Sequence, residues 1–206
     1  MARVQSSCKE TQMMTKTRLE AFSDGVLAII ITIMVLELKI PHEVSFGALY
    51  KLMPVFFSYL MSFIFVGIYW GNHHHLLHTV HHVTSKIIWG NMGLLFFLSL
   101  IPFTTGWMGE NDFQGLTVAL YAFDLFLCAV AFNVLQNVIM AHHTHSTALI
   151  IALKGQEKKG MLSLFIYVLA VTAAFFYPVV SGVLILITAV IWIIPDKNIE
   201  KALHEG

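Results

Sequence analysis

The chain has 206 residues and no net charge when its histidines are neutral, with 57% hydrophobic and only 12% charged residues. Soluble domains carry about 25% charged residues, so this chain has about half the usual solvating charge. Its composition and its long apolar runs therefore predict a polytopic membrane protein. Zero net charge and the lack of a basic patch with interleaved aromatic residues argue against a nucleic-acid partner.

Six apolar runs are long enough, or nearly so, for a helix to cross the bilayer core, which needs about 20 residues. Backbone groups in lipid must be paired within their own segment, and the runs lack the alternation of barrel strands, so we predict helices. The expected fold is an all-α integral membrane protein with one six-helix domain over residues 1–206. The expected spans are 19–38, 49–72, 87–108, 113–141, 161–177 and 179–194.

The connections between these runs differ in length and character. The second and third runs are joined by the histidine-rich stretch HHHLLHTVHHVTSK, and the third and fourth by GENDFQ. The fifth and sixth are separated only by Tyr177-Pro178, which predicts a tight helical hairpin because proline cannot continue a helix.

The basic residues predict the orientation. With six spans both termini share a side, and that side collects ten of the twelve lysines and arginines. The other side keeps only Lys39 and Lys51, next to an acidic loop. Because basic residues accumulate on the cytoplasmic side of membrane proteins, we expect both termini in the cytoplasm.

The first run has a regular face. At helical spacing, one stripe is formed by Phe22, Gly25, Ile29, Thr32 and Leu36. Such a stripe is typical of a helix that packs around a symmetry axis. It is also typical of an ordinary helix–helix seam in which a glycine permits close approach. The residues alone leave both interpretations open.

Asp24 is unusual in this setting, because an ionised aspartate at the centre of a span costs about 2.5–3.5 kcal/mol on insertion scales. Arg18 lies six residues earlier, which is not a same-face spacing on a helix. We therefore expect a buried Asp24 whose partner lies on another helix or a neighbouring chain. The alternative is a residue at the level of the lipid headgroups or a helix cap.

These residues also form a longer pattern. The pattern is RxxxFSDG, formed here by Arg18, Phe22, Ser23, Asp24 and Gly25. It resembles the signature that opens the first helix of the transmembrane protein 175 family of endosomal/lysosomal potassium channels. Further similarities to the family are Trp70, His73-His74, Trp89-Gly90-Asn91 and Pro102-Phe103. The specific motifs thus lie in about the first half of the chain.

The resemblance implies an assembly and a function. A single six-helix chain resembles the prokaryotic members, which implies a homotetramer in the cell (inner) membrane with the first helix of each subunit lining a central pore. Ile29 would form the constriction, with Thr32 and Leu36 as the next layers outward. The expected function is passive conduction of K⁺, without catalysis, cofactor or resident metal.

The selectivity expected from such a pore follows from hydration. Four isoleucine side chains around an axis form a short apolar ring that can block by dewetting. A passing ion must lose part of its water there, and K⁺ holds its water less strongly than Na⁺. Hydroxyl groups of Thr32 just outside the ring are suitable replacement ligands. We expect moderate selectivity for K⁺.

The resemblance also implies an interhelical network behind the pore. In it, Asp24 would contact His73, His74 or Asn91, with Trp70 packing nearby. The chemistry is suitable, because an imidazole and an amide can each donate a hydrogen bond to a buried carboxylate.

The histidines support an alternative. One cluster comprises His73, His74, His75, His78, His81 and His82, and a second comprises His142, His143 and His145. Imidazoles four residues apart on a helix can share a metal ion, and HxxHH resembles the box of di-iron membrane enzymes. A metal or proton transporter is a further alternative. Without metal, interfacial histidines would respond to pH.

Two other acids are notable. Asp124 lies within the fourth run and is a candidate buried acid or interhelical contact. Glu37 lies one residue beyond the stripe and, as an acidic ring, would concentrate cations at the outer mouth. An ordinary solvated charge at a helix end explains Glu37 equally well.

Overall fold

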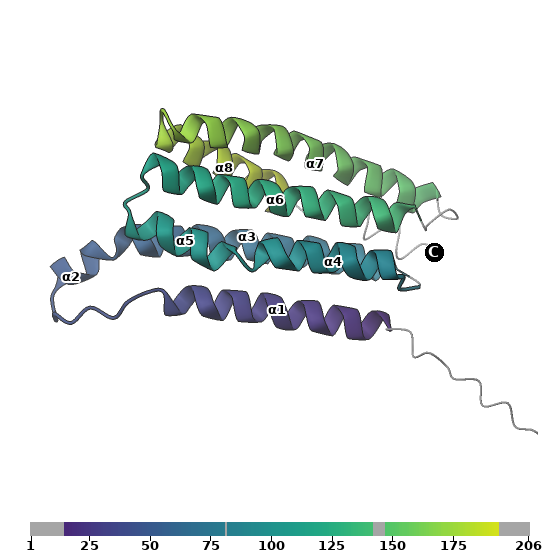
Figure 1. Ribbon diagram of the computed structural model, residues 1–206, viewed down its shortest axis with the longest axis horizontal. Coiled ribbons are helices and arrows are strands. Elements are labelled where there is room, and N and C mark those ends of the chain that lie inside the picture. Colours follow the sequence, from purple (N-terminus) through teal and green to yellow (C-terminus); the bar gives the residue numbers. More distant parts are fainter. Residues whose placement is uncertain (1–14, 81, 142–146, 194–206) are drawn as a thin grey trace, which may run out of the picture.

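The computed structural model describes residues 15–80, 82–141 and 147–193, and for 147–154 the backbone only. These residues form an all-helical bundle (Figure 1). The helices in chain order are α1 (Lys16–Leu36), α2 (Phe46–Lys51), α3 (Met53–His78), α4 (Ser85–Leu98), α5 (Ile101–Glu110), α6 (Gly115–Met140), α7 (Thr147–Ala174) and α8 (Pro178–Ile193).

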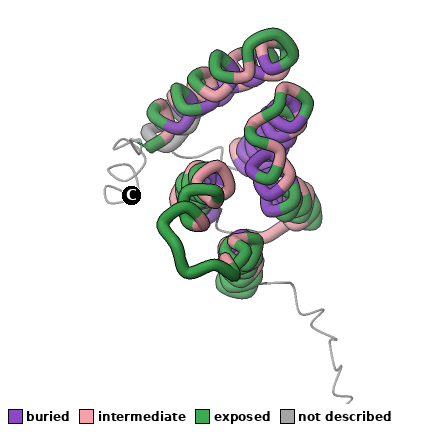
Figure 2. Tube along the Cα trace, turned by 90° about the vertical axis from the view of Figure 1, so that its left-hand side faces the viewer, coloured by how far each residue is buried: buried purple, intermediate pink, exposed green. Residues whose placement is uncertain are grey.

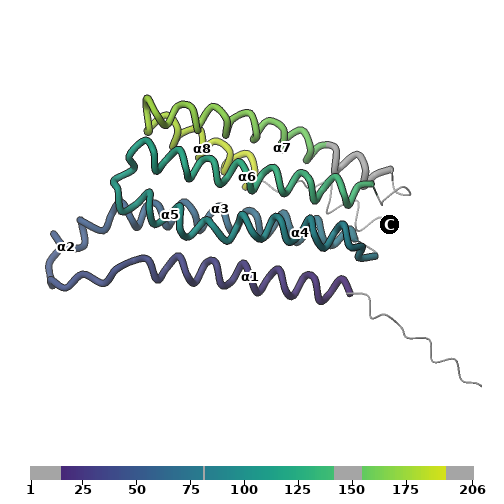
Figure 3. The backbone as a smooth tube through the Cα atoms, viewed as in Figure 1, coloured from purple at the N-terminus to yellow at the C-terminus, as the bar shows by residue number. Residues whose placement is uncertain are grey.

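The long helices lie side by side along one axis. Helix α1 forms one edge of the bundle and the hairpin of α7 and α8 forms the other, with α3 to α6 between them (Figures 1 and 3). Helix α6 lies at the centre of the packing, where it contacts α4, α5, α7 and α8. The buried residues of α6 include Tyr121, Leu125, Phe132 and Leu135. The core is therefore built around α6, whereas α1 is held from one side only.

Within the described ranges, four helical segments are long and apolar enough to cross a membrane. They are Lys16–Leu36, Met53–His78, Ser85–Glu110 and Gly115–Met140. Helix α8 is apolar but shorter, and α7 carries charged residues such as Glu157 and Lys158 in its first half. The chain is thus a multi-pass membrane protein with at least these candidate spans.

The third predicted span, 87–108, lies within the candidate span Ser85–Glu110, which consists of two helices and not of one continuous helix. Helix α4 ends at Leu98 and α5 begins at Ile101. Pro102 lies in the first turn of α5 and has no N–H to donate to the carbonyl of Leu98. The two helices continue in nearly the same direction (Figure 1), so the segment still has the length of one span.

Two helices extend beyond the predicted apolar spans. Helix α3 continues to His78 beyond the expected end at residue 72, and α7 begins at Thr147 instead of 161. Hydropathy marks only the apolar part of a helix, whereas backbone hydrogen bonds continue through polar residues. The predicted break at Tyr177-Pro178 is confirmed, because α7 ends at Ala174 and α8 begins at Pro178.

Candidate functional site: the first helix and its contacts

Helix α1 has two unlike faces. Its buried residues are Leu19, Ser23, Leu27, Ile30 and Met34, which pack toward α3, α4 and α5. The predicted stripe lies on the exposed side, where Phe22 is 48% exposed, Ile29 58% and Leu36 79%. Figure 2 shows how much of this edge helix is uncovered in the single chain. An apolar stripe of this extent is available to lipid or to another subunit.

Thr32 and Gly25 belong to the same exposed stripe. The Thr32 hydroxyl donates a hydrogen bond to the Ile29 carbonyl at 2.8 Å. Its only proton is thereby used within the helix, so its oxygen presents free lone pairs outward. Such an oxygen can serve as a ligand for a monovalent cation. At Gly25 a Cβ atom would meet nothing within 4 Å, so this position leaves open space on the stripe.

Three buried side chains join α1, α3 and α4. Asn91 Nδ2 donates to Ser23 Oγ at 2.9 Å, and Ser23 Oγ donates to the Leu19 carbonyl at 2.9 Å. Asn91 Oδ1 lies 2.6 Å from His73 Nε2, which must be the protonated nitrogen because an amide oxygen only accepts. This chain of bonds contains His73 and Asn91, two residues of the predicted interhelical network, and the role of that network behind a pore stays a prediction.

Asp24 has its partner on another helix, as expected, but that partner is Trp70 and not His73, His74 or Asn91. Its Oδ1 accepts a hydrogen bond from Trp70 Nε1 at 3.0 Å and makes none with His73, His74 or Asn91. Asp24 is also exposed in the single chain rather than buried. The reason is helical geometry, because successive residues are turned by about 100°. Ser23 therefore faces the interior, whereas Asp24 faces the edge of α3.

His74 takes part through ring stacking instead of hydrogen bonding to Asp24. Its ring lies 6.2 Å from that of Trp70, with the two planes 29° apart. Trp70 is 49% exposed, so the Asp24–Trp70–His74 group forms a partly open polar edge next to the buried network.

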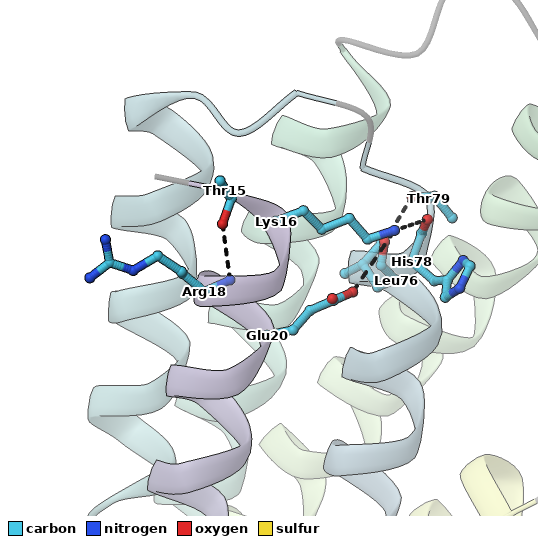
Figure 4. A network of polar contacts seen from close by, with 7 residues as sticks. All are labelled: Thr15, Lys16, Arg18, Glu20, Leu76, His78 and Thr79. Atoms are coloured by element: carbon cyan, nitrogen blue, oxygen red, sulfur yellow. Dashed lines mark hydrogen bonds and ion pairs between the residues drawn. The ribbon is translucent and has the colours of Figure 1, made fainter. Parts of the chain in front are cut away.

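A second contact holds the N-terminal end of α1 (Figure 4). Lys16 Nζ donates to the His78 carbonyl at 2.7 Å and lies 3.9 Å from Glu20 Oε1. Arg18 points away from this cluster and is exposed, while its backbone N–H is capped by Thr15 at 3.4 Å. Sequence reasoning missed Lys16, whose pairing with the end of α3 has no signal in the motif.

The opposite end of α1 is fastened to α5. Lys39 forms an ion pair with Glu110, and Glu37 lies beside Gly106, where a Cβ atom would be 3.6 Å from Glu37 Oε2. The Glu110 carboxylate accepts a hydrogen bond from Lys39 and thereby raises the pKa of this exposed lysine. Glu37 itself is exposed at the end of the helix.

The histidines do not form a metal site in the part of the chain that the structure describes. No group of three or more histidine, cysteine or acidic residues there is arranged to hold a metal ion. The rings of His74 and His78 are 6.1 Å apart and meet edge to face. His81, His142, His143 and His145 lie outside the described residues, so the predicted HxxHH box is described only in part.

Comparison with known proteins identifies the family. The family model described as endosomal/lysosomal potassium channel TMEM175 matches residues 18–102. A protein of a Chryseobacterium species, named as a potassium channel, is 49% identical over 94% of this chain and 100% of its own length. The chain belongs to the TMEM175 family.

A second sequence relative and a solved structure extend the comparison. A potassium channel of Streptomyces collinus is 32% identical over 57% of this chain and 61% of its own length. The crystal structure of a lysosomal potassium-selective channel TMEM175 homolog from Chamaesiphon minutus superposes with a TM-score of 0.76 at 26% identity. That similarity covers 86% of this chain and 96% of the Chamaesiphon chain. The structural similarity extends to most of the bundle, whereas the match to the TMEM175 family model covers most of α1, then α2, α3 and α4, and the start of α5.

Proposed function

We propose that this chain is one subunit of a homotetrameric channel that conducts K⁺ passively across a prokaryotic cell membrane. In this proposal the chain forms a single domain of six spans, with α7 and α8 as the fifth and sixth and both termini in the cytoplasm. Support comes from the full-length similarity to a named potassium channel and from the similarity to a solved potassium-selective channel. Both relatives are ion channels by name, and an enzyme is not favoured.

The observation that carries the proposal is the exposed apolar stripe of α1. Four copies of α1 around an axis would bury Phe22, Ile29 and Leu36, which the single chain leaves uncovered. The opposite face of α1 is already occupied by α3, α4 and α5, so the stripe is the side available for an axis. The Asn91 network would hold α1 at a defined distance from that axis.

In the assembled pore, Ile29 would form the constriction and Thr32 the next layer. An apolar ring removes water from the ion, which costs less for K⁺ than for Na⁺, and the Thr32 oxygens offset part of that cost. Leu36 would form the outermost apolar layer of the stripe. Arg18 lies near the N-terminal mouth, where its exposed guanidinium is free to interact with a neighbouring subunit or with anions.

The experiment is an Ile29→Asn exchange tested in liposomes that contain the purified protein. We expect an assembled tetramer whose K⁺/Na⁺ permeability ratio falls toward unity, because a polar ring no longer requires dehydration. Bi-ionic reversal potentials measure the ratio directly. Val35→Asn is the matched control, since Val35 is an exposed apolar residue of α1 that is turned by about 120° from Ile29.

The two variants separate the possible failures. An equal loss of selectivity in both would mean that the stripe does not face the pore. Unchanged selectivity in Ile29→Asn would remove Ile29 from the constriction. A protein that passes neither ion would contradict the channel function itself.

A further inference from the structure

Asp124 is a buried acid that the pore described above does not use. It lies in α6 and is only 3% exposed. It is nine residues from the start of the helix, which corresponds to about 14 Å along the axis. Thr104 Oγ1 of α5 lies 3.0 Å from its Oδ2 atom. Its Oδ1 atom has no hydrogen-bond partner among the residues that the structure describes.

Among the described residues, no ion pair joins Asp124 to a cationic group. The ion pairs between described residues are Lys16–Glu20 and Lys39–Glu110, neither of which involves Asp124. A carboxylate with one hydroxyl donor and no counter-charge is costly inside a membrane protein. The neutral acid avoids that cost.

The other titratable groups around Asp124 are neutral at ordinary pH. Tyr69 of α3 and Tyr121 and Cys128 of α6 are the titratable groups near it. Tyr167 of α7 lies near Cys128, and its hydroxyl accepts a hydrogen bond from Thr188. In the described parts of the other neighbours, α8 has no titratable side chain and α4 has only the exposed Lys86. A proton is therefore the ligand that this environment favours.

The contacts of Thr104 allow the carboxyl group to exist with or without that proton. A threonine hydroxyl has a single proton to donate and can also accept. Thr104 Oγ1 lies 3.0 Å from Asp124 and also 3.2 Å and 3.4 Å from the carbonyl oxygens of Ile101 and Leu100. With an ionised Asp124 the hydroxyl donates to the carboxylate. With a protonated Asp124 it accepts from the acid and donates to those carbonyls at the α4–α5 break.

Helix α5 connects this site to α1. It is held to α3 by Thr105, whose hydroxyl oxygen is 2.6 Å from Ser62 Oγ. It is held to the end of α1 by the Lys39–Glu110 pair, and to α6 by Thr104. A change at Thr104 therefore acts on a ten-residue helix that touches the pore-lining helix of the proposed channel.

We propose that Asp124 is a proton-binding site inside each subunit, and that proton binding there controls how α5 is fastened to α6 and thereby the C-terminal end of α1. The effect on ion flux rests on the proposed channel function. The binding of the proton does not, and it is tested separately.

The first experiment is infrared spectroscopy of the full-length protein in liposomes over a range of pH. A protonated, buried carboxyl group has a carbonyl-stretching band distinct from that of a carboxylate, and the band shifts in D₂O. We expect this band at neutral pH in the wild type, its conversion to a carboxylate band at alkaline pH, and its loss in Asp124→Asn. The absence of the band at neutral pH, or its persistence in the variant, would overturn the proposal.

Two controls keep this test decisive. Asp112→Asn removes an exposed acid on the loop before α6 and should leave the band unchanged. If Asp124→Asn does not assemble, Thr104→Val serves instead, because it keeps the acid but should shift its band; an unchanged band would contradict the Thr104 contact. A response of the carboxyl bands to K⁺ instead of pH would assign a cation site and overturn the proton site.

The second experiment measures K⁺ flux against pH in the same liposomes. An amide has the shape of the protonated acid, so Asp124→Asn should show at every pH the flux that the wild type shows at acid pH. Asp112→Asn should follow the wild type. A flux in Asp124→Asn that keeps the full pH dependence of the wild type would contradict the coupling. No flux in any variant would contradict the channel function and leave the infrared result standing.

Discussion

The polar contacts of α4 and those of α5 hold neighbouring parts of the same bundle in different ways. Asn91 of α4 donates to Ser23 and accepts from His73, so each member of that group has a partner. Thr104 of α5 meets an acid with a second oxygen that no described residue contacts. A fully paired neutral network resists change, whereas a half-paired acid responds to protons.

The difference also concerns the helices themselves. The Asn91 network, which consists of Ser23, His73 and Asn91, joins α1, α3 and α4 at one level, near the end of α1 that carries the signature motif. Helix α5 is short, begins at a proline-induced break and depends on several separate side-chain contacts. We therefore expect the α4 region to determine whether the bundle forms and the α5 region to determine how it moves.

The largest effect is expected from Asn91→Leu. It would leave the hydroxyl of Ser23 and the ring of His73 buried without this partner. The loss should lower the free energy of unfolding by about 1–3 kcal/mol for each group. Thermal unfolding of the detergent-solubilised protein, followed by loss of the assembled species, measures the change. Asn137→Leu is the control, because Asn137 is exposed on α6 and should cost little. Equal losses in the two variants would contradict the importance of the network.

Gly109→Ala should have the next largest effect, since α3 and α5 approach closely there. A Cβ atom at Gly109 would lie 2.8 Å from the Cα atom of Val55, and backbone cannot move aside easily. Overpacking of this kind costs about 1–3 kcal/mol. Gly67→Ala on α3 is the matched control, because its Cβ would meet nothing within 4 Å. The same thermal measurement applies, and a stable Gly109→Ala would mean that α5 adjusts more readily than we expect.

Trp70→Phe tests the partly open polar edge formed by Asp24, Trp70 and His74 beside the Asn91 network. The exchange keeps an aromatic ring but removes the N–H that donates to Asp24. We expect a loss of about 1 kcal/mol, because both groups are partly solvated and water replaces the bond. Unfolding of the variant measures this loss. A loss as large as that of Asn91→Leu would show that Asp24 and Trp70 become buried in the assembly.

The smallest effect is expected from Lys39→Gln. The pKa of Lys39 is raised by Glu110, so the contribution of the pair is complete below the pKa of an unfolded lysine and is lost as pH rises through the folded pKa. Solvent screens this exposed pair, and salt should reduce its contribution further. The wild type and the variant should therefore converge in unfolding midpoint at strongly alkaline pH or high salt. A constant difference across pH would assign another role to Lys39.

The amino-acid sequence alone determined the class of protein, the number of apolar runs and the stripe of α1. These depend on composition and helical spacing, which are local properties of the chain. The signature residue Ser23 and the network residues His73 and Asn91 were also found from sequence, through a resemblance to a family. The pore role of Ile29, Thr32 and Leu36 stays a prediction.

Only the tertiary structure decided which side chain meets which. Ser23 and not Asp24 enters the buried network, because one residue turns the side chain by about 100° and the neighbouring helices occupy only one side. Asp124 was visible as an acid in an apolar run, but its hydrogen-bond partner among the described residues is Thr104, twenty residues earlier in the chain. Such contacts depend on the packing of whole helices, and no local pattern encodes which residue of a neighbouring helix lies opposite.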